Sequence, residues 1–398
     1  MKGKKTYRNK LKRIIIGFIS VILVVFIGLL SISGIFVRTE YLKPWQKDYA
    51  KDFDDPRIQL AAHGILAANG HNMQPWIIRP DKGDTDVFYL YADSERFTNQ
   101  VDPYARQMMV SQGTFLEYVS IAGDKLGYKT NIELYPEGSY DEANLAESMK
   151  SLPVAKITLA KSEQADNRLY DSIFLPDTNR SAYKEDKLTD EEKKQLAELN
   201  TDSSLSIEIF DDKENLDKLG NIVMEGITVE SGTERVMKET EVIFRPNEYV
   251  KNKYRYGFSM EGQGTTGIMK HLMQGLVTVF PSLNEGSASA DLFIKSGQTS
   301  ADSTPAYILI KSVDNSRDSQ VLSGMLYSRL IAAAHNLGLV MQPLSQPLEE
   351  YPEMETVYKQ IHGSYASDGS TIQMLIRIGR PAKQAPRSMR RDVMSFIY

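Results

Sequence analysis

The chain has 398 residues, with 47 Lys and Arg against 52 Asp and Glu, a formal net charge of −5 and no cysteine. Single hydrophobic cores stop growing at roughly 250–300 residues, so this length predicts more than one domain. The lack of cysteine excludes disulfides, thiol nucleophiles, cysteine-ligated zinc and iron–sulfur clusters. The mildly acidic total favours no nucleic-acid partner, and we expect none.

The N-terminal residues differ from the rest in charge. Residues 1–39 hold eight basic residues and no acidic one, which leaves a charge of −13 on the remainder. Residues 1–13 form a basic tail, and residues 14–37 carry no charge. A helix of this length, at about 1.5 Å per residue, crosses a hydrocarbon core of about 30 Å. We therefore predict a transmembrane helix over 14–37 and a lipid bilayer as partner.

The basic tail also predicts orientation. Positive residues stay on the cytoplasmic side, so we expect a single-pass protein of the cell membrane with its N-terminus cytoplasmic and its main domain outside. A cleaved signal peptide is the alternative, because Ser31, Ser33 and Gly34 imitate a cleavage site. The apolar run is longer than the about 7–15 residues of a signal peptide, which favours a retained anchor.

After a predicted linker at 38–51, helical and strand patterns alternate through the chain, which predicts an α+β fold. We expect helices at 58–68, 113–127, 190–199 and 324–338, and strands at 77–79, 87–92, 128–135, 154–159, 205–210, 306–311, 339–344 and 371–378. Residues 113–127 and 324–338 also form an internal repeat. Both begin with Gly and end in Leu-Gly, and a strand-like run follows each.

Several motifs with familiar chemistry lack their expected context. Gly262–Gly267 fits G-x-G-x-x-G but follows no hydrophobic strand, so a mobile glycine loop is favoured over a dinucleotide site. The five histidines show no metal-binding spacing, and we expect no metal. No G-x-S-x-G is present, and no convincing catalytic acid or nucleophile stands out.

Two kinds of segment favour ligand binding. The run His71-Asn72-Met73-Gln74-Pro75-Trp76 places two amides and an imidazole beside a fixed turn, and amides suit the edge of a heteroaromatic ring. Arginines that can bind phosphate in a bidentate manner occur near residue 180 and in the C-terminal tail. We interpret Arg390 and Arg391 as part of a solvated basic tail.

Taken in order, these segments resemble the nitroreductase-like FMN flavoproteins, in particular the Acg-type branch, in which two such units are fused. His71–Trp76 is similar to the family's S-S-x-N-x-Q-P-W loop, and Asp102-Pro103 with Arg106 to its D-P-x-x-R segment. Further matching segments are Thr178-Asn179-Arg180 through Tyr183, Leu337-Gly338 through Pro347, Arg377 through Arg380, and Pro386-Arg387.

The resemblance implies a nitroreductase-like α+β fold with two tandem units, 52–165 and 166–398, that form a pseudo-dimer in one chain. It also implies a lid or insertion at about 214–286 and a monomer with one FMN per chain. No protein side chain would be catalytic, because the flavin carries the chemistry. The implied FMN-binding residues are His71, Asn72, Gln74, Pro75, Trp76, Thr178, Arg180, Ser181, Pro343, Leu344, Ser345, Arg377, Arg380 and Arg387.

The resemblance implies a membrane-anchored, FMN-dependent oxidoreductase that reduces nitroaromatic or quinone-like small-molecule acceptors. Its electron donor would be NAD(P)H or a membrane component. The alternative is a protein that sequesters FMN beneath a covering lid with little or no turnover. A third hypothesis is a membrane-tethered structural module that has lost its site.

Overall fold

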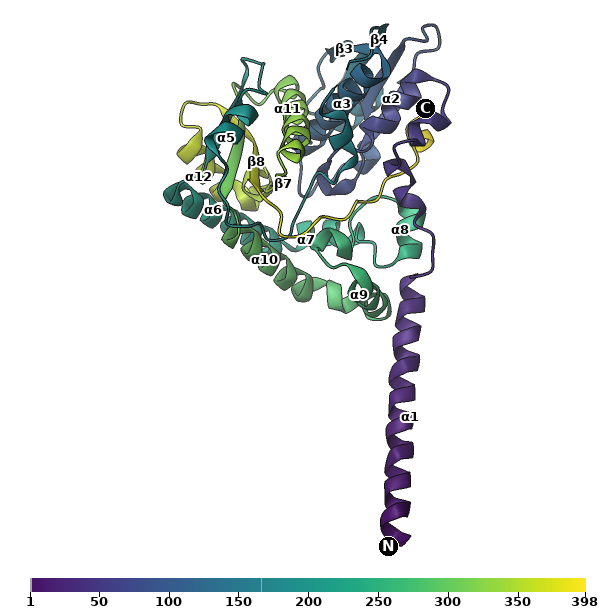
Figure 1. Ribbon diagram of the computed structural model, residues 1–398. Helices are drawn as coiled ribbons and strands as arrows, with labels where there is room; N and C mark the ends of the chain where they lie inside the picture. Colours follow the sequence, from purple (N-terminus) through teal and green to yellow (C-terminus); the bar gives the residue numbers. More distant parts are fainter. Residues whose placement is uncertain (1, 166) are drawn as a thin grey trace.

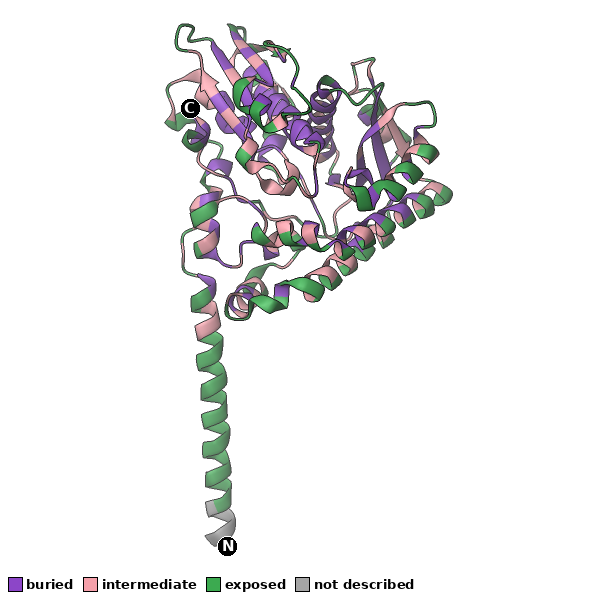
Figure 2. Ribbon diagram, turned by 180° about the vertical axis from the view of Figure 1, so that it is seen from behind, coloured by how far each residue is buried: buried purple, intermediate pink, exposed green. Residues whose placement is uncertain are grey.

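A single long helix projects from the folded body (Figure 1). The computed structural model describes residues 2–165 and 167–398. Helix α1 (Lys2–Ser33) has a mean hydropathy of 3.0 over its most apolar stretch, none of which is buried, so it is long and apolar enough to cross a membrane. Figure 2 shows this exposure along nearly the whole helix.

Two antiparallel sheets with the same strand order form the centre of the body. The first has the order β1-β2-β4-β3 and the second the order β5-β6-β8-β7. The strands are β1 (Trp76–Pro80), β2 (Val87–Ala92), β3 (Tyr128–Leu134), β4 (Ala155–Lys161), β5 (Leu205–Phe210), β6 (Ala306–Ser312), β7 (Val340–Pro343) and β8 (Thr371–Gly379). The expected α+β fold class is confirmed.

Each sheet has a long helix between its second and third strands, α3 (Arg106–Leu126) in the first and α11 (Arg317–Asn336) in the second. Asp102 caps α3 by accepting hydrogen bonds from the backbone N–H groups of Gln107 and Met108, at 3.1 and 3.0 Å. The first unit also contains α2 (Pro56–Gly64) and α4 (Leu145–Ser151), and the second contains α5 (Asp190–Ala197) and α12 (Glu355–Tyr365). The sequence repeat therefore has a structural counterpart.

The second unit carries a helical insertion between β5 and β6, where the first unit has a short connection. It consists of α6 (Lys213–Gly232), α7 (Glu234–Val242), α8 (Glu248–Tyr254), α9 (Gly267–Val279) and α10 (Gly286–Asp302). In Figure 1 these helices form a layer below the sheets that reaches across to α1. The insertion thus extends from the body to the apolar helix.

Helices α3 and α11 join the two units through a close crossing. A Cβ atom on Gly113 would lie 1.8 Å from the carbonyl oxygen of Val321, and one on Gly324 would lie 2.0 Å from that of Val110. Only glycine allows backbones to approach this closely. Gly113 and Gly324 are the matching first residues of the sequence repeat, so the repeat meets itself at this crossing.

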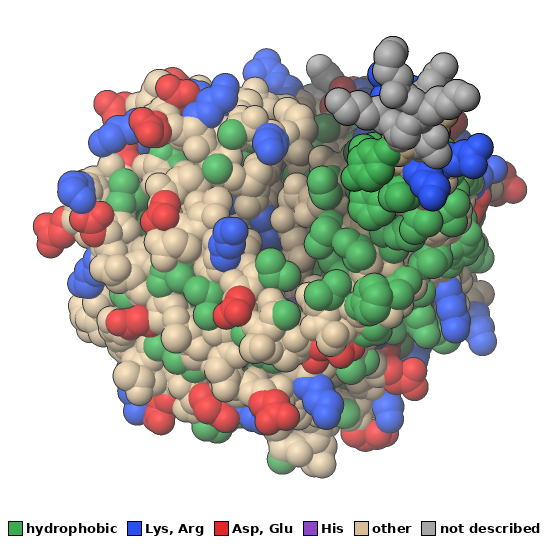
Figure 3. All heavy atoms as spheres, turned by 90° about the horizontal axis from the view of Figure 1, so that it is seen from below, with side chains coloured by type: hydrophobic (Ala, Val, Ile, Leu, Met, Phe, Trp, Pro, Cys, Tyr) green, Lys and Arg blue, Asp and Glu red, His purple; other side chains and the backbone are tan. Residues whose placement is uncertain are grey.

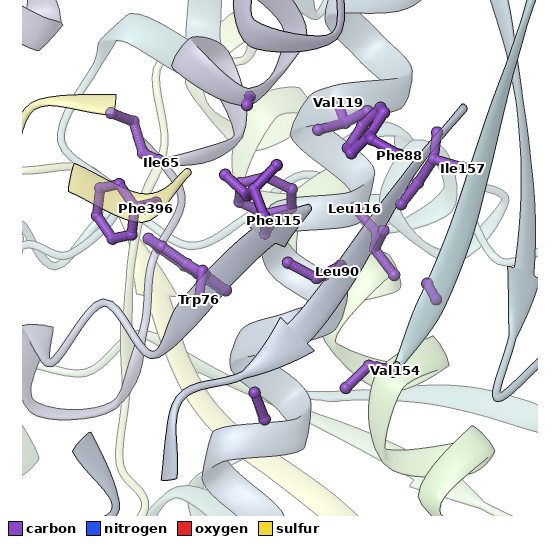
Figure 4. Close-up of a cluster of buried hydrophobic side chains, with 14 of the residues drawn as sticks. Ile65, Trp76, Phe88, Leu90, Phe115, Leu116, Val119, Val154, Ile157 and Phe396 are labelled. Atoms are coloured by element: carbon purple, nitrogen blue, oxygen red, sulfur yellow. The ribbon is translucent and has the colours of Figure 1, made fainter. Parts of the chain in front are cut away.

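The C-terminal tail returns from the second unit to the first. Ile397 pairs with Ile78 of β1, and the N–H of Tyr398 donates to the carbonyl of Ile78 at 3.0 Å. Phe396 packs against Trp76 with ring centroids 6.1 Å apart, and Figure 4 shows both rings in the core of the first unit. The C-terminal residues therefore complete the hydrophobic core of the first unit.

The apolar N-terminal segment differs from its predicted bounds. We expected a helix at 14–37, but α1 extends back through the basic tail and ends at Ser33. Gly34 has φ +78°, a left-handed conformation that ends the helix. The predicted linker at 38–51 is packed into two short 3₁₀ helices, Glu40–Trp45 and Tyr49–Asp52, and Trp45 is buried.

We predict that Gly324→Ala lowers the stability of the protein by about 3 kcal/mol or more, because the new methyl group meets helix backbone that cannot rotate away. Gly113→Ala should behave alike. Thermal unfolding of the full chain in detergent measures the effect.

Gly363→Ala in α12 is the matched control, since a Cβ there meets no atom within 4 Å. It should be neutral or stabilise by up to about 1 kcal/mol. Equal melting temperatures for Gly324→Ala and Gly363→Ala would contradict the role of the crossing.

Candidate functional site

The loop before β1 is held in a strained conformation. His71, Asn72 and Gln74 have φ values of 50°, 53° and 54°. Left-handed backbone costs a residue with a Cβ about 1–2 kcal/mol, and it persists only where the surroundings enforce it. Here Gln112 of α3 donates to the carbonyl of Pro75 at 2.8 Å, and Trp76 Nε1 donates to that of Ser111 at 2.9 Å. Helix α3 thus anchors the loop.

The two amide side chains of this loop bind two protein segments. Asn72 Nδ2 donates to the carbonyl oxygens of Gly257 at 2.9 Å and Met389 at 3.1 Å. Gln74 Nε2 donates to the carbonyl of Arg255 at 2.8 Å, and its Oε1 accepts from the N–H of Arg391 at 2.9 Å. The amides therefore fasten the insertion and the C-terminal tail to the first unit.

Arg180 of the second unit lies opposite this loop. Burial, followed by the positive charge of Arg180, lowers the pKa of His71 to about 4, so the imidazole is neutral at pH 7. Surrounding protein also lowers the pKa of Arg180, although its side chain keeps access to solvent. Arg180 therefore lies near His71 and keeps contact with solvent. We refer to the region around His71 of the first unit and Arg180 of the second as the recess.

No carboxylate among the described residues forms an ion pair with Arg180. Its one hydrogen bond there is long, 3.4 Å from Nη1 to the carbonyl of Gly262. Beside it, the buried hydroxyl of Tyr327 neighbours Thr178 and makes no hydrogen bond of ordinary geometry within that part of the chain. Ser181 Oγ donates to Asn179 Oδ1 at 2.6 Å. The recess therefore offers an available cation with hydroxyl groups around it.

The other arginines implied by the resemblance have partners within the protein. Arg377 is fully buried, stacks on Tyr183, and donates to Gln342 Oε1 at 2.8 Å and to the carbonyl of Ser181 at 2.7 Å. Arg380 pairs with Glu192 at 2.7 Å. Arg387 is exposed and lies over the ring of Trp45. Arg377 thus braces the loop that presents Arg180.

The interpretation of Arg390 as a solvated residue is wrong. Its side chain is buried, and Nη1 donates to Asn72 Oδ1 at 2.8 Å while Nη2 donates to the carbonyl of Leu66 at 2.7 Å. Its ring contact is with Trp45. Arg391 is likewise partly covered and lies over Phe396. The tail folds back into the first unit, so its arginines meet carbonyl groups in place of water.

The Pro343–Ser345 segment leads to a buried acidic pair that sequence reasoning missed. The N–H of Leu344 donates to the carbonyl of Leu375 at 2.8 Å, while Ser345 Oγ lies 3.5 Å from Glu349 Oε1. Glu349 and Glu230 of α6 are both buried, and burial raises the pKa of each carboxyl, with their mutual repulsion adding to the shift of Glu349. Nothing in the sequence marks Glu230, which lies in the insertion.

Comparison with known proteins gives similarities in fold alone. No protein-family model matches the chain, and no curated protein sequence matches it. A nitroreductase-like protein from Bacillus cereus is similar at 12% identity and a TM-score of 0.30, over 59% of this chain and 96% of that one.

Two further solved structures are similar to this chain to the same degree. An FMN-dependent nitroreductase from Mycobacterium smegmatis in complex with NADPH has 12% identity and a TM-score of 0.31, over 55% and 92% of the two chains. A nitroreductase with bound FMN from Desulfitobacterium hafniense has 14% identity and a TM-score of 0.32, over 57% and 96%. Similarities at this level assign no activity to the chain.

We predict that Glu349→Gln stabilises the protein at pH 8 relative to wild type. A raised carboxyl pKa means that the folded state favours the protonated form. The contribution of this group to stability is therefore fully present below the unfolded pKa of about 4.5, and it is lost as the pH rises through the folded pKa. Between pH 5 and 8 the wild type should therefore lose more stability than Glu349→Gln does.

Melting temperatures of the full chain at both pH values test this expectation. Glu355→Gln is the control, because Glu355 is exposed on α12 and pairs with Lys359. An identical pH dependence for wild type and Glu349→Gln would show that the acidic pair does not hold a proton.

Proposed function

We propose that this protein is a membrane-anchored, FMN-dependent oxidoreductase of the nitroreductase type. One observation carries the proposal. The strained 71–76 loop of the first unit includes His71, and Arg180 of the second unit lies close enough to His71 to lower its pKa. These are the two segments whose sequences resemble the flavin-binding loop and the phosphate element of that family.

The residues of the recess fit the chemical demands of FMN. Arg180 supplies positive charge for the phosphate, with the hydroxyl groups of Thr178 and Tyr327 beside it. The N–H of Ser345 is the better candidate for a donor to the flavin ring, because that of Leu344 is already used within the protein. Neutral His71 would face the ring. Asn72 and Gln74 hold the loop to the insertion and the tail, and Trp76, which the resemblance also implied, is buried in the core of the first unit.

When bound, FMN supplies hydride and electron transfer. The protein orients the group and controls access to it. We propose NAD(P)H or a membrane component as electron donor and a nitroaromatic or quinone-like molecule as acceptor. Since α3 and α11 already join two units within one chain, we further propose a monomer with one FMN.

We also propose that α1 anchors the protein in the cell membrane with the N-terminus cytoplasmic. The most apolar stretch of α1 is not buried against the body. Protease protection in intact cells tests the orientation.

The alternative, an FMN-sequestering protein, is favoured by one observation. The insertion contacts residues on both sides of the recess: Arg255 and Gly257 bind the amides of the 71–76 loop, and Gly262 contacts Arg180. A cover fastened in this way would restrict the access of an acceptor.

The full chain, purified in detergent, should show a flavin absorption spectrum or gain one when FMN is added. Addition of NADPH should then bleach the flavin, and a quinone or nitroaromatic should restore it. Lack of any FMN binding would contradict the proposed function. Bound FMN that neither reaction changes would support the sequestering protein.

We predict that Arg180→Ala weakens FMN affinity by about 10- to 100-fold, because a charge-assisted hydrogen bond contributes about 1.5–3 kcal/mol. Quenching of FMN fluorescence on binding measures this affinity. Arg380→Ala is the matched control, since Arg380 already pairs with Glu192. It should bind FMN within about twofold of wild type. An equal loss of FMN affinity in both variants would show that Arg180 does not bind the phosphate.

A further inference from the structure

Helix α9 and the turn that follows expose large apolar side chains. Ile268, Met269, Val279, Phe280 and Leu283 are 44–55% exposed. We refer to these five residues as the apolar rim. Five large apolar side chains are thus exposed within sixteen residues. Contiguous exposed apolar patches mark sites of contact with a protein or a membrane.

The polar side chains of α9 point the opposite way. Gln274 is fully buried and donates to Glu248 Oε1 of α8 at 3.1 Å, and Lys270 pairs with the same carboxylate at 2.9 Å. A surface helix in water turns its polar face outward and its apolar face inward. Helix α9 has polar groups bound inside the body and apolar groups at its surface, which is the arrangement suited to lipid.

Helix α9 packs directly on α1. A Cβ on Gly275 would lie 2.5 Å from the carbonyl oxygen of Leu29, and Ser33 Oγ lies 3.1 Å from His271 Nδ1. In Figures 1 and 2, α9 lies beside the upper end of α1. Seen from below in Figure 3, the hydrophobic side chains of α1 itself form one large patch. Helix α9, which carries most of the rim, therefore adjoins this apolar helix.

The contact also fixes a depth. Leu29 lies four residues before the end of α1, which is about 6 Å along the axis. Amphipathic helices that lie in the membrane interface are buried by about 5–10 Å at the boundary of headgroups and acyl chains. If α1 spans the bilayer to its end, α9 lies at this boundary.

We propose that α9 and the turn at 280–283 lie in the interface of the bilayer that α1 crosses, with the apolar rim among the lipid acyl chains. The proposal rests on the membrane anchoring proposed above. It makes the insertion a lid seated in the membrane. Gly262, which contacts Arg180 in the recess, is only five residues from the start of α9. The cover of the candidate site is thereby tethered to lipid.

Because the chain contains no cysteine, single cysteines allow a clean test. A nitroxide is attached to the full chain at Phe280→Cys and, in a second variant, at Leu283→Cys, and the protein is placed in lipid nanodiscs. Phe18→Cys in the middle of α1 and Val313→Cys after β6 are the references, with 66% and 63% exposed side chains. Power saturation with oxygen and with a water-soluble nickel chelate reports the depth of each label.

We expect labels at 280 and 283 to show a ratio of oxygen to nickel accessibility severalfold above that at 313 and closer to that at 18. Nickel accessibility equal to that at 313 would overturn the proposal. Shielding from both reagents, with dipolar broadening between labels, would also overturn it and indicate a second copy of the chain on the rim. A water-exposed label at 18 would instead refute the anchoring itself.

Discussion

The close approach of Gly113 and Gly324 is the constraint on which the remaining structure depends. With either glycine enlarged, α3 and α11 would have to separate, and the two units would lose their fixed relation. That relation places the 71–76 loop of one unit against Arg180 of the other. The ion pair of Arg329 with Glu117, at 2.7 Å, supports the same crossing. A contact between backbones thus determines which side chains share a recess.

Fusion of two units in one chain lets the halves differ. The insertion α6–α10 belongs only to the second unit, and the tail that completes β1 belongs only to the end of the chain. Both segments meet at the amides of Asn72 and Gln74. In the absence of disulfides, this polar clamp and the packing of Phe396 on Trp76 hold the tail in place. The strain of the loop is offset by the contacts it makes with both segments.

The sequence was sufficient to predict features that depend on local pattern. The glycine-framed repeat, most strands and the unusual 71–76 loop follow from residue spacing, glycine conformation and amide chemistry. The roles of the arginines were not predictable in this way. Which groups surround Arg180, Arg377 and Arg390 depends on how distant segments of the chain pack around them. Arg390 is buried because the tail folds back over Leu66, and Glu230 meets Glu349 because α6 packs against the turn at Gln346–Leu348 that follows β7. Contacts between residues hundreds of positions apart leave no local signal.

The charge of the body bears on the anion site proposed at Arg180. Outside the N-terminal region the chain carries −13, so the body as a whole repels anions. Arg329 and Arg380 are neutralised by carboxylates, whereas Arg180 has none among the described residues and faces a neutral His71. An arginine without a carboxylate partner attracts a phosphate more strongly than one that is already neutralised. The hydrogen bond that Arg180 makes in the described part of the chain is the long one to the carbonyl of Gly262 in the insertion. An anion in the recess would therefore compete with the lid for Arg180, so that binding at the site and the position of the insertion are coupled.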